Sequence, residues 1–323
     1  MGVLFIVLSA CKTNWTCYQL LNTNCTRSSE RRKMAAGNHT GVAVFLLVLN
    51  IFLSLTAILG NILILFALYK VSSLHSPTKL LFLCLAVTDL FIGLISQPLF
   101  AVAIMSEIPN VNLNPLCLYY VGRVNSSSSY ILCVVSILTS TAISVDRLFA
   151  LLLGLRYRYV VTSRRVFVVI IWLRFIGVSC GSLYLWRNDV AWSVVMVVII
   201  ISLVTSASSY IKIYRKLCYQ QRQVHSQREQ NLDNRKRFKG GRIERYRKTV
   251  AGIWWVQLAI LACYIPFVIV ATLRIHGGIY GDGLQMARRL VVTFIYFNSS
   301  LNPILYCWTI AEVRQVVKDA IWR

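Results

Sequence analysis

The chain has 323 residues, of which 57% are hydrophobic and only 14% are charged. Soluble domains carry about 25% charged residues, so this composition excludes an ordinary water-soluble fold and indicates several membrane spans. The formal net charge is +23. That charge is compatible with nucleic-acid binding, but the basic residues gather between apolar stretches, as in the cytoplasmic loops of membrane proteins. The sequence therefore predicts a lipid bilayer around the chain and no nucleic-acid partner.

Seven stretches are long and apolar enough to cross a bilayer, which takes about 20 residues in a helix. A transmembrane barrel would alternate polar and apolar residues instead, so we predict an all-α membrane protein, a seven-transmembrane helix bundle. In chain order the predicted spans are Val42–Tyr69, Thr78–Met105, Leu116–Leu152, Val166–Tyr184, Val190–Leu217, Lys248–Ile275 and Met286–Ile310.

The predicted membrane domain covers residues 42–310 and is followed by a short tail, residues 311–323. In this tail, valines such as Val313 and Val317 share one helical face, while Arg314 and Lys318 lie on another. This pattern predicts a short amphipathic eighth helix along the inner leaflet.

The loops predict the orientation of the bundle. The linker 212–248 and the segment 156–165 are densely basic, so we expect both in the cytoplasm. Alternation then places residues 1–41 outside the cell, in a multi-pass protein of the plasma membrane. Residues 1–33 are interpreted either as a signal-like segment or as an extension of the gene model before Met34.

Three acceptor sequons in the N-terminal segment agree with an outside location, because glycans are attached on the luminal side during synthesis. We expect glycosylation at Asn14, Asn24 and Asn38.

Asp89 lies in the middle of the second predicted span, where an unpaired carboxylate costs about 3 kcal/mol on insertion scales. It is therefore expected to face polar residues inside the bundle. One interpretation is a hydrogen-bonded knot that locks the helices together. The other is a hydrated cation site, because carboxylate, hydroxyl and amide oxygens suit sodium. Candidate neighbours are Asn61, Ser136, Asn298, Ser299 and Asn302.

Three further features concern motion. Asp146 and Arg147 end the third span, where an acid and a base can exchange partners, although an arginine at an inner helix end also snorkels ordinarily. Pro266 interrupts the sixth span and Pro303 the seventh. A proline inside a helix produces a kink, which is either a pivot or a static bend.

Taken together, these residues resemble the rhodopsin-like (class A) family of G-protein-coupled receptors, from Gly60 to the tail. Seven motifs of the family occur in the right spans and in the right order. They are Gly60-Asn61 of the first helix, LAxxD at Leu85–Asp89, DRY at Asp146–Leu148, Trp172, Tyr210, CWxP at Cys263–Pro266 with Tyr264 in place of tryptophan, and NPxxY at Asn302–Tyr306.

The resemblance implies that an extracellular ligand stabilises one of two arrangements of the bundle. The sixth helix then swings outward and a heterotrimeric G protein docks against Arg147. The implied coupling and switch residues are Asp146, Arg147, Tyr210, Tyr264, Pro266, Asn302, Pro303 and Tyr306. The family also implies a sodium ion as an allosteric modulator, held by Asp89, Ser136, Asn298 and Asn302. No other cofactor is expected.

The resemblance also limits the ligand. Ser129 stands where amine receptors carry an aspartate, and Tyr296 stands where opsins carry a lysine, so amines are disfavoured and retinal is excluded. We expect a peptide, a lipid or a small polar molecule. The expected pocket residues are Gln97, Ser126, Ser129, Tyr130, Arg274 and Tyr296.

Three departures from the family pattern are similar to the melanocortin branch, within the wider melanocortin, lysophospholipid, cannabinoid and adenosine receptor group. The second outer loop, 185–189, is very short, and the fifth span has no proline. Cys117 lies outward of the position of the usual third-helix cysteine, so we expect the usual outer disulfide to be absent. Cys117 could instead pair with an N-terminal cysteine.

A transporter or channel is the alternative, because it also uses an intramembrane acid and proline-broken helices. The chain shows no internal repeat, which argues against it. An enzyme is not expected, since no catalytic or metal-ligating constellation appears within the spans.

Overall fold

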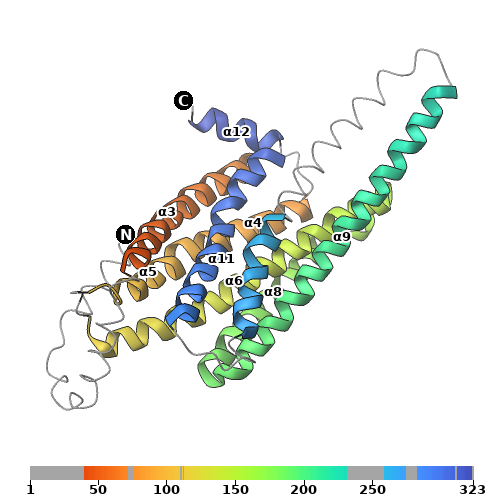
Figure 1. Cartoon of the computed structure of the whole chain (residues 1–323). Coiled ribbons are helices and arrows are strands. Elements are labelled where there is room, and N and C mark those ends of the chain that lie inside the picture. The colour runs from red at the N-terminus through yellow and green to blue at the C-terminus, as the bar shows by residue number, and fades with distance from the viewer. Residues whose placement is uncertain are drawn as a thin grey trace.

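The structure, a computed structural model, describes residues 40–71, 76–109, 111, 113–230, 258–273, 282–309 and 311–321. All regular structure in these ranges is helical, and the long helices lie side by side in one bundle (Figure 1). Six helices are long and apolar enough to span a membrane, and a shorter apolar helix covers Leu258–Leu273. The predicted all-α membrane bundle is therefore confirmed.

The helices follow the predicted spans closely. The second span is continuous but contains one π-helical turn, and the third ends in a short 3-10 turn before a further helical turn. In chain order the elements are α3 Thr40–Lys70, α4 Ser76–Phe91, η2 Ile92–Ser96, α5 Gln97–Met105, α6 Pro115–Leu153, η3 Gly154–Arg156, α7 Tyr157–Val160, α8 Ser163–Trp186, α9 Asn188–Gln230, the helix Leu258–Leu273, α11 Asp282–Thr309 and α12 Ala311–Ile321.

α9 continues well beyond Leu217, where the fifth span was predicted to end. The extension is polar and basic, so hydropathy does not register it. It contains no proline or glycine that would end a helix. The extended helix projects from the bundle (Figure 1).

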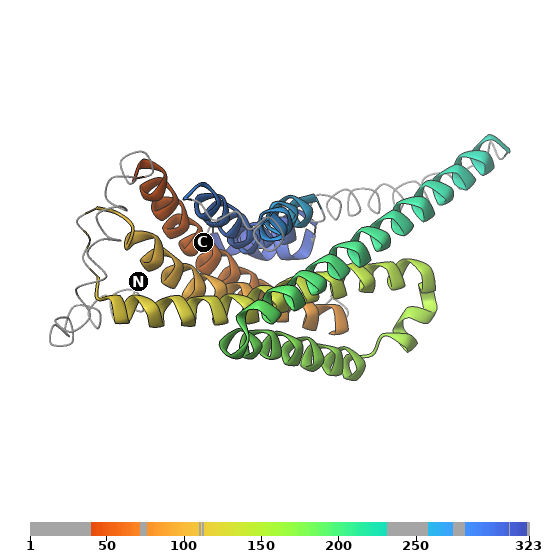
Figure 2. The ribbon, with the colours of Figure 1, turned by 60° about the horizontal axis from the view of Figure 1, so that its bottom comes forward.

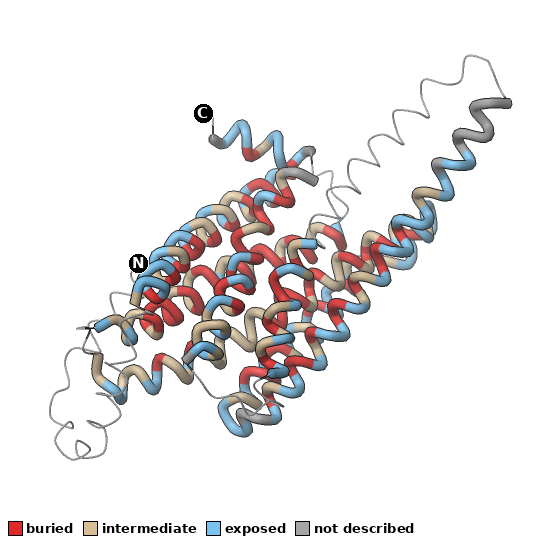
Figure 3. The backbone as a smooth tube through the Cα atoms, in the orientation of Figure 1, coloured by how far each residue is buried: buried red, intermediate tan, exposed pale blue. Residues whose placement is uncertain are grey.

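The buried polar residues of the described helices face the interior of the bundle beside small and apolar residues, and many large apolar residues face outward. Buried positions form stripes on the inward faces of the helices (Figure 3). On α3, for example, Asn50, Ala57 and Asn61 are fully buried, whereas Phe45 and Leu59 are more than 60% exposed. Outward apolar surface of this kind suits lipid, not water.

α6 lies at the centre of the bundle, packed against α4 and α5 on one side and against α8 and α9 on the other (Figure 2). Two glycines of α8 allow the closest of these contacts. A Cβ atom at Gly177 would lie 2.9 Å from the backbone oxygen of Ile131, and one at Gly181 would lie 3.1 Å from that of Ser127.

The amphipathic α12 packs against α3 and α11. Val313 and Val317 are buried in one cluster with Ile64, Leu68 and Tyr306. Arg314 and Lys318 are exposed. The predicted short helix after the last span is therefore present, with its valines against the bundle.

Replacing Gly177 by alanine should destabilise the α6–α8 contact. The added methyl group meets a backbone oxygen that cannot rotate away, and such overpacking costs about 1–3 kcal/mol. The matched control is Gly122→Ala in α6, where nothing lies within 4 Å and alanine should be neutral or stabilising by about 0.5–1 kcal/mol. Thermal unfolding in detergent measures both, and equal midpoints for the two variants would contradict the contact.

Candidate functional site

Asp89 of α4 is the hub of a polar core in the middle of the bundle. Its side chain is fully buried. Its Oδ1 accepts hydrogen bonds from Ser136 Oγ of α6 at 3.0 Å and from Ser299 Oγ of α11 at 2.9 Å. Its Oδ2 accepts from Asn302 Nδ2 at 2.5 Å. Three donors from two helices satisfy a carboxylate that would otherwise be very costly in this position.

A proline explains one further bond of this core. Pro303 has no N–H, so the carbonyl oxygen of Ser299, four residues earlier, lacks its helical partner. Asn61 Nδ2 of α3 donates to that oxygen at 3.2 Å. Gly60 lets α3 approach this closely, because a Cβ there would lie 2.8 Å from Pro303 Cγ. The Gly60-Asn61 pair therefore serves the proline bend of α11.

More hydrogen bonds connect α3 to α11 further out. Asn50 Nδ2 donates to Thr293 Oγ1 at 2.9 Å. Ser300 Oγ donates to the carbonyl oxygen of Leu53 at 2.9 Å. These contacts fit the interpretation of the polar residues as a knot that holds the helices together.

The core also keeps unused acceptors, which is what a cation site needs. Asn298 Oδ1 and Asn61 Oδ1 are buried and have no hydrogen-bond partner among the described residues. Asn298 lies one turn before Asn302 on α11. Together with the hydroxyl oxygens of Ser136 and Ser299 beside Asp89, the residues offer the hard oxygen ligands that suit sodium.

Asp146 and Arg147 occupy the end of α6 nearest to α7. Asp146 accepts hydrogen bonds from Thr78 Oγ1 at 2.9 Å and from the Tyr157 hydroxyl at 2.6 Å. The side chain of Arg147 lies over a different residue, with its Cζ 5.4 Å from the centroid of the Phe82 ring. That ring packs edge-on against the ring of Tyr306, with the two centroids 5.0 Å apart. The acid is therefore paired with hydroxyl groups, and the adjacent arginine lies among aromatic rings.

The other predicted switch residues lie on the helices that surround α6. Tyr210 of α9 is buried, and its hydroxyl accepts a hydrogen bond from Ser144 Oγ at 3.1 Å. Tyr264 is buried in the same hydrophobic cluster as Phe267. Pro266 lies between them in the helix Leu258–Leu273.

A cavity opens at the other end of the bundle, away from α12. Its smaller inner part has a volume of about 90 Å³ and its wider outer part about 780 Å³. Four predicted residues line the inner part, namely Ser126, Ser129, Tyr130 and Tyr296. Ser129 Oγ and the Tyr296 hydroxyl lie 2.7 Å apart and form a hydrogen bond.

Several cavity residues were missed from the sequence. The aromatic walls come from Phe100, Trp192 and Phe267, and Arg288 is the charged residue of the inner part. Their signal was weak, because aromatic residues at helical spacing are ordinary in membrane helices.

One predicted pocket residue, Gln97, does not line the cavity. Gln97 is fully buried and lines neither part. Within the part of the chain that the structure describes, both polar atoms of its side-chain amide lack hydrogen-bond partners. The π-helical turn η2 immediately before it adds a residue to one turn and so redirects the side chains that follow. Arg274 lies outside the described residues, as do the predicted glycosylation sites Asn14, Asn24 and Asn38.

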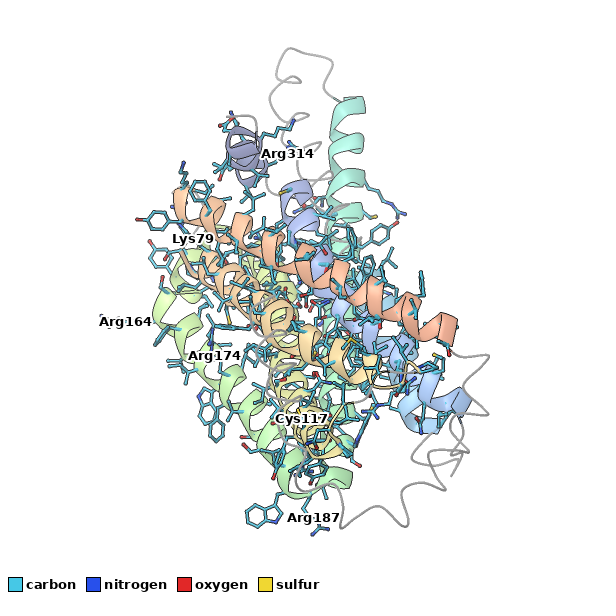
Figure 4. All side chains as sticks on the ribbon, turned by 90° about the vertical axis from the view of Figure 1, so that its left-hand side faces the viewer. Lys79, Cys117, Arg164, Arg174, Arg187 and Arg314 are labelled. Atoms are coloured by element: carbon cyan, nitrogen blue, oxygen red, sulfur yellow. The ribbon has the colours of Figure 1, made fainter. Side chains whose placement is uncertain are left out.

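Cys117 at the start of α6 is disulfide-bonded (labelled in Figure 4). The usual outer disulfide was expected to be absent and the pairing of Cys117 was left open, and the structure shows that this residue is paired. The N-terminal cysteines, named as its alternative partners, lie outside the described residues.

Comparisons with known proteins show that the sequence of this chain is similar to receptors. Residues 60–190 and 177–306 match the family described as 7 transmembrane receptor (rhodopsin family). The human histamine H2 receptor is 27% identical over 283 residues, covering 79% of this chain and 73% of that receptor. The dog histamine H2 receptor is 29% identical over the same shares. Human melanocortin receptor 5 is 23% identical over 315 residues, covering 93% and 92%. Which branch the chain resembles most stays a prediction.

Tyr157→Phe should weaken the inner end of the bundle. It removes a hydroxyl that donates to a buried carboxylate, and such a loss costs about 1–3 kcal/mol. Tyr159→Phe is the matched control, because Tyr159 is 84% exposed. A lower unfolding midpoint for the first variant alone is expected, and the same midpoint for both would show that the Asp146 bond has no energetic role.

Proposed function

Because the chain belongs to the rhodopsin family of seven-transmembrane receptors, which act as G-protein-coupled receptors of the plasma membrane, we propose that it passes an extracellular signal along α11 to a heterotrimeric G protein. The observation that carries this proposal is the position of three groups on one helix. Tyr296 lines the inner part of the cavity, Asn302 bonds Asp89, and Tyr306 packs against Phe82.

The distance along this helix suits transmission. Tyr296 and Tyr306 are separated by about 15 Å of helix at 1.5 Å per residue. A ligand that shifts Tyr296 therefore acts on the same rigid element that ends beside the aromatic surroundings of Arg147. It does so only if its affinities for the two arrangements of the bundle differ.

The switch residues then have distinct roles. Arg147 is the residue that a G protein contacts. Asp146, the adjacent residue, is held by Thr78 and Tyr157 and keeps a negative charge beside it. Pro303 supplies the bend of α11, braced by Gly60, and Pro266 supplies the bend of the helix Leu258–Leu273. Matches to receptors leave the transporter or channel alternative without support.

The ligand is proposed to be a peptide, a lipid or a small polar molecule, and not an amine or retinal. A protonated amine needs an anion in its pocket. The inner part of the cavity is lined by Ser129, at the position where amine receptors have an aspartate. It is also lined by Arg288, whose positive charge repels an amine. Tyr296 replaces the lysine that retinal requires. The likeness to the histamine H2 receptors is one of sequence, at 27% and 29% identity, and the proposed ligand class rests on Ser129 and Arg288 instead.

Arg147→Gln should abolish nucleotide exchange on an added G protein, because the neutral side chain lacks the charge and the fork of donors that the partner binds. Surface expression should be unchanged, since Arg147 forms no ion pair with Asp146. The control is Arg187→Gln, at the opposite end of the bundle. Normal exchange by the Arg147 variant would refute the assigned role.

Sodium is proposed to bind between Asp89, Ser136, Asn298 and Asn302, with Ser299 as an additional oxygen ligand. A ligand that binds only the folded state adds about 1.4 kcal/mol to stability at ten times its dissociation constant. NaCl should therefore raise the unfolding midpoint above that in choline chloride of equal ionic strength.

Asp89→Asn should remove this difference, because the site loses its charge. Ser54→Ala should keep it, since Ser54 bonds the Gly93 carbonyl and not Asp89. If the Asp89 variant still responds specifically to sodium, the ion binds elsewhere.

A further inference from the structure

Two arginines flank a connected set of aromatic rings at the outer cavity. Tyr130 is the middle ring, and its centroid lies 5.0 Å from that of Tyr184 and 5.9 Å from that of Trp192. Arg123 Cζ lies 5.5 Å from the Tyr184 centroid, and Arg288 Cζ lies 5.8 Å from the Trp192 centroid. Three helices, α6, α8 and α9, thus supply the rings, and α6 and α11 supply the cations.

Both guanidinium groups face the same space. Arg123 and Arg288 line the outer part of the cavity, and Arg288 also lines the inner part. Phe100, Trp192 and Phe267 line both parts, so the two parts lie next to each other. A ligand that enters from the wide part meets the cations before it reaches the apolar inner part.

The charges along the described wall of the outer part are unbalanced. Three arginines and one glutamate give a net charge of +2. The glutamate, Glu107, is already ion-paired with Arg289. Arg123 and Arg288, the two residues on the aromatic rings, carry the other two positive charges of this wall.

Arg123 is held in place. Its Nη2 donates to the carbonyl oxygen of Leu185 at 2.7 Å, at the end of α8. A cation–π contact contributes only about 0.5–1 kcal/mol at an exposed site. By contrast, a guanidinium group binds a carboxylate or phosphate through paired, charge-assisted hydrogen bonds. The arrangement is therefore better suited to an incoming anion than to stabilising the fold.

We propose that the ligand of this receptor is an amphipathic organic anion. Its carboxylate or phosphate group binds Arg288 and Arg123, and its apolar body enters the inner part of the cavity and packs against Trp192 and Phe267. Those two rings already stack, with centroids 5.8 Å apart and planes 20° apart. The inference rests on the proposed receptor function, which places a ligand at this end of the bundle.

The test measures binding without a G protein. The full-length receptor is placed in nanodiscs of neutral lipid, and its thermal unfolding is followed with a panel of naphthalene derivatives. Members share the ring and differ in the head group, which is a carboxylate, a phosphate, a carboxamide or an aminomethyl group. At least one acid should raise the unfolding midpoint and bind at least tenfold more tightly than its amine counterpart. The better acid identifies the head group.

Variants assign that preference to the two arginines. Arg288→Gln and Arg123→Gln should each weaken acid binding, and Arg288→Lys should restore part of it. Arg288→Glu should favour the amine. The matched control is Arg187→Gln, since Arg187 is exposed at the end of α8 and lines neither part of the cavity (labelled in Figure 4). This control should bind the acid as the unmodified chain does.

Three results would overturn the proposal: an amine or amide that binds as tightly as its acid, acid binding that survives both glutamine substitutions, or no stabilisation by any acid. Nucleotide exchange on an added G protein is measured separately on the same samples. Acid binding without exchange would count against the receptor function alone. Exchange driven by a compound that does not need the arginines would count against the anion site alone.

Discussion

The bundle depends on the hydrogen bonds that keep one carboxylate satisfied inside the membrane. Asp89 receives donors from α6 and α11, and each bond is made possible by a polar residue that a simple membrane anchor would not contain. Removing any of these donors leaves a buried charge with fewer partners, which is costly in a medium without water. The same need fixes how α4, α6 and α11 face one another.

The proline of α11 extends this constraint to α3. Pro303 leaves the carbonyl oxygen of Ser299 without its helical donor, and Asn61 donates a hydrogen bond to it. Gly60 allows α3 and α11 to approach closely enough for this bond, because a Cβ atom there would collide with Pro303. Ser299 thus serves two neighbours, with its hydroxyl on Asp89 and its carbonyl on Asn61. The bend and the polar core are consequently one structure, and α11 cannot straighten without disturbing both.

The sequence alone was sufficient to predict the membrane helices and most of the residues that surround Asp89. Length and hydropathy locate the membrane helices, and Asp89 needs partners wherever it lies, so the hydroxyl and amide residues of other spans were its natural candidates. The helix ends were less predictable. α9 continues to Gln230 because its polar extension contains no helix breaker, and hydropathy does not register such a segment.

The residues that line the cavity were predicted only in part, and the reasons are physical. Ser126, Ser129, Tyr130 and Tyr296 were expected from the family pattern, and all four line it. Gln97 was placed there because no sequence signal announces the π-helical turn before it. The pairing of Arg289 with Glu107, and the ring contacts of Arg123 and Arg288, depend on helix packing. They set the charge of the cavity.

The central claim is that the bonds of Asp89 couple α4 to α11. A double-mutant cycle tests it most directly, using Asp89→Ala, Asn302→Ala and the double variant, with the free energy of unfolding as the measured quantity. Residues in one hydrogen-bond network show interaction energies of about 0.5–3 kcal/mol. The account predicts a coupling in this range, with the double variant losing less stability than the two single losses combined. Additive losses would contradict it, because the two residues would then be independent.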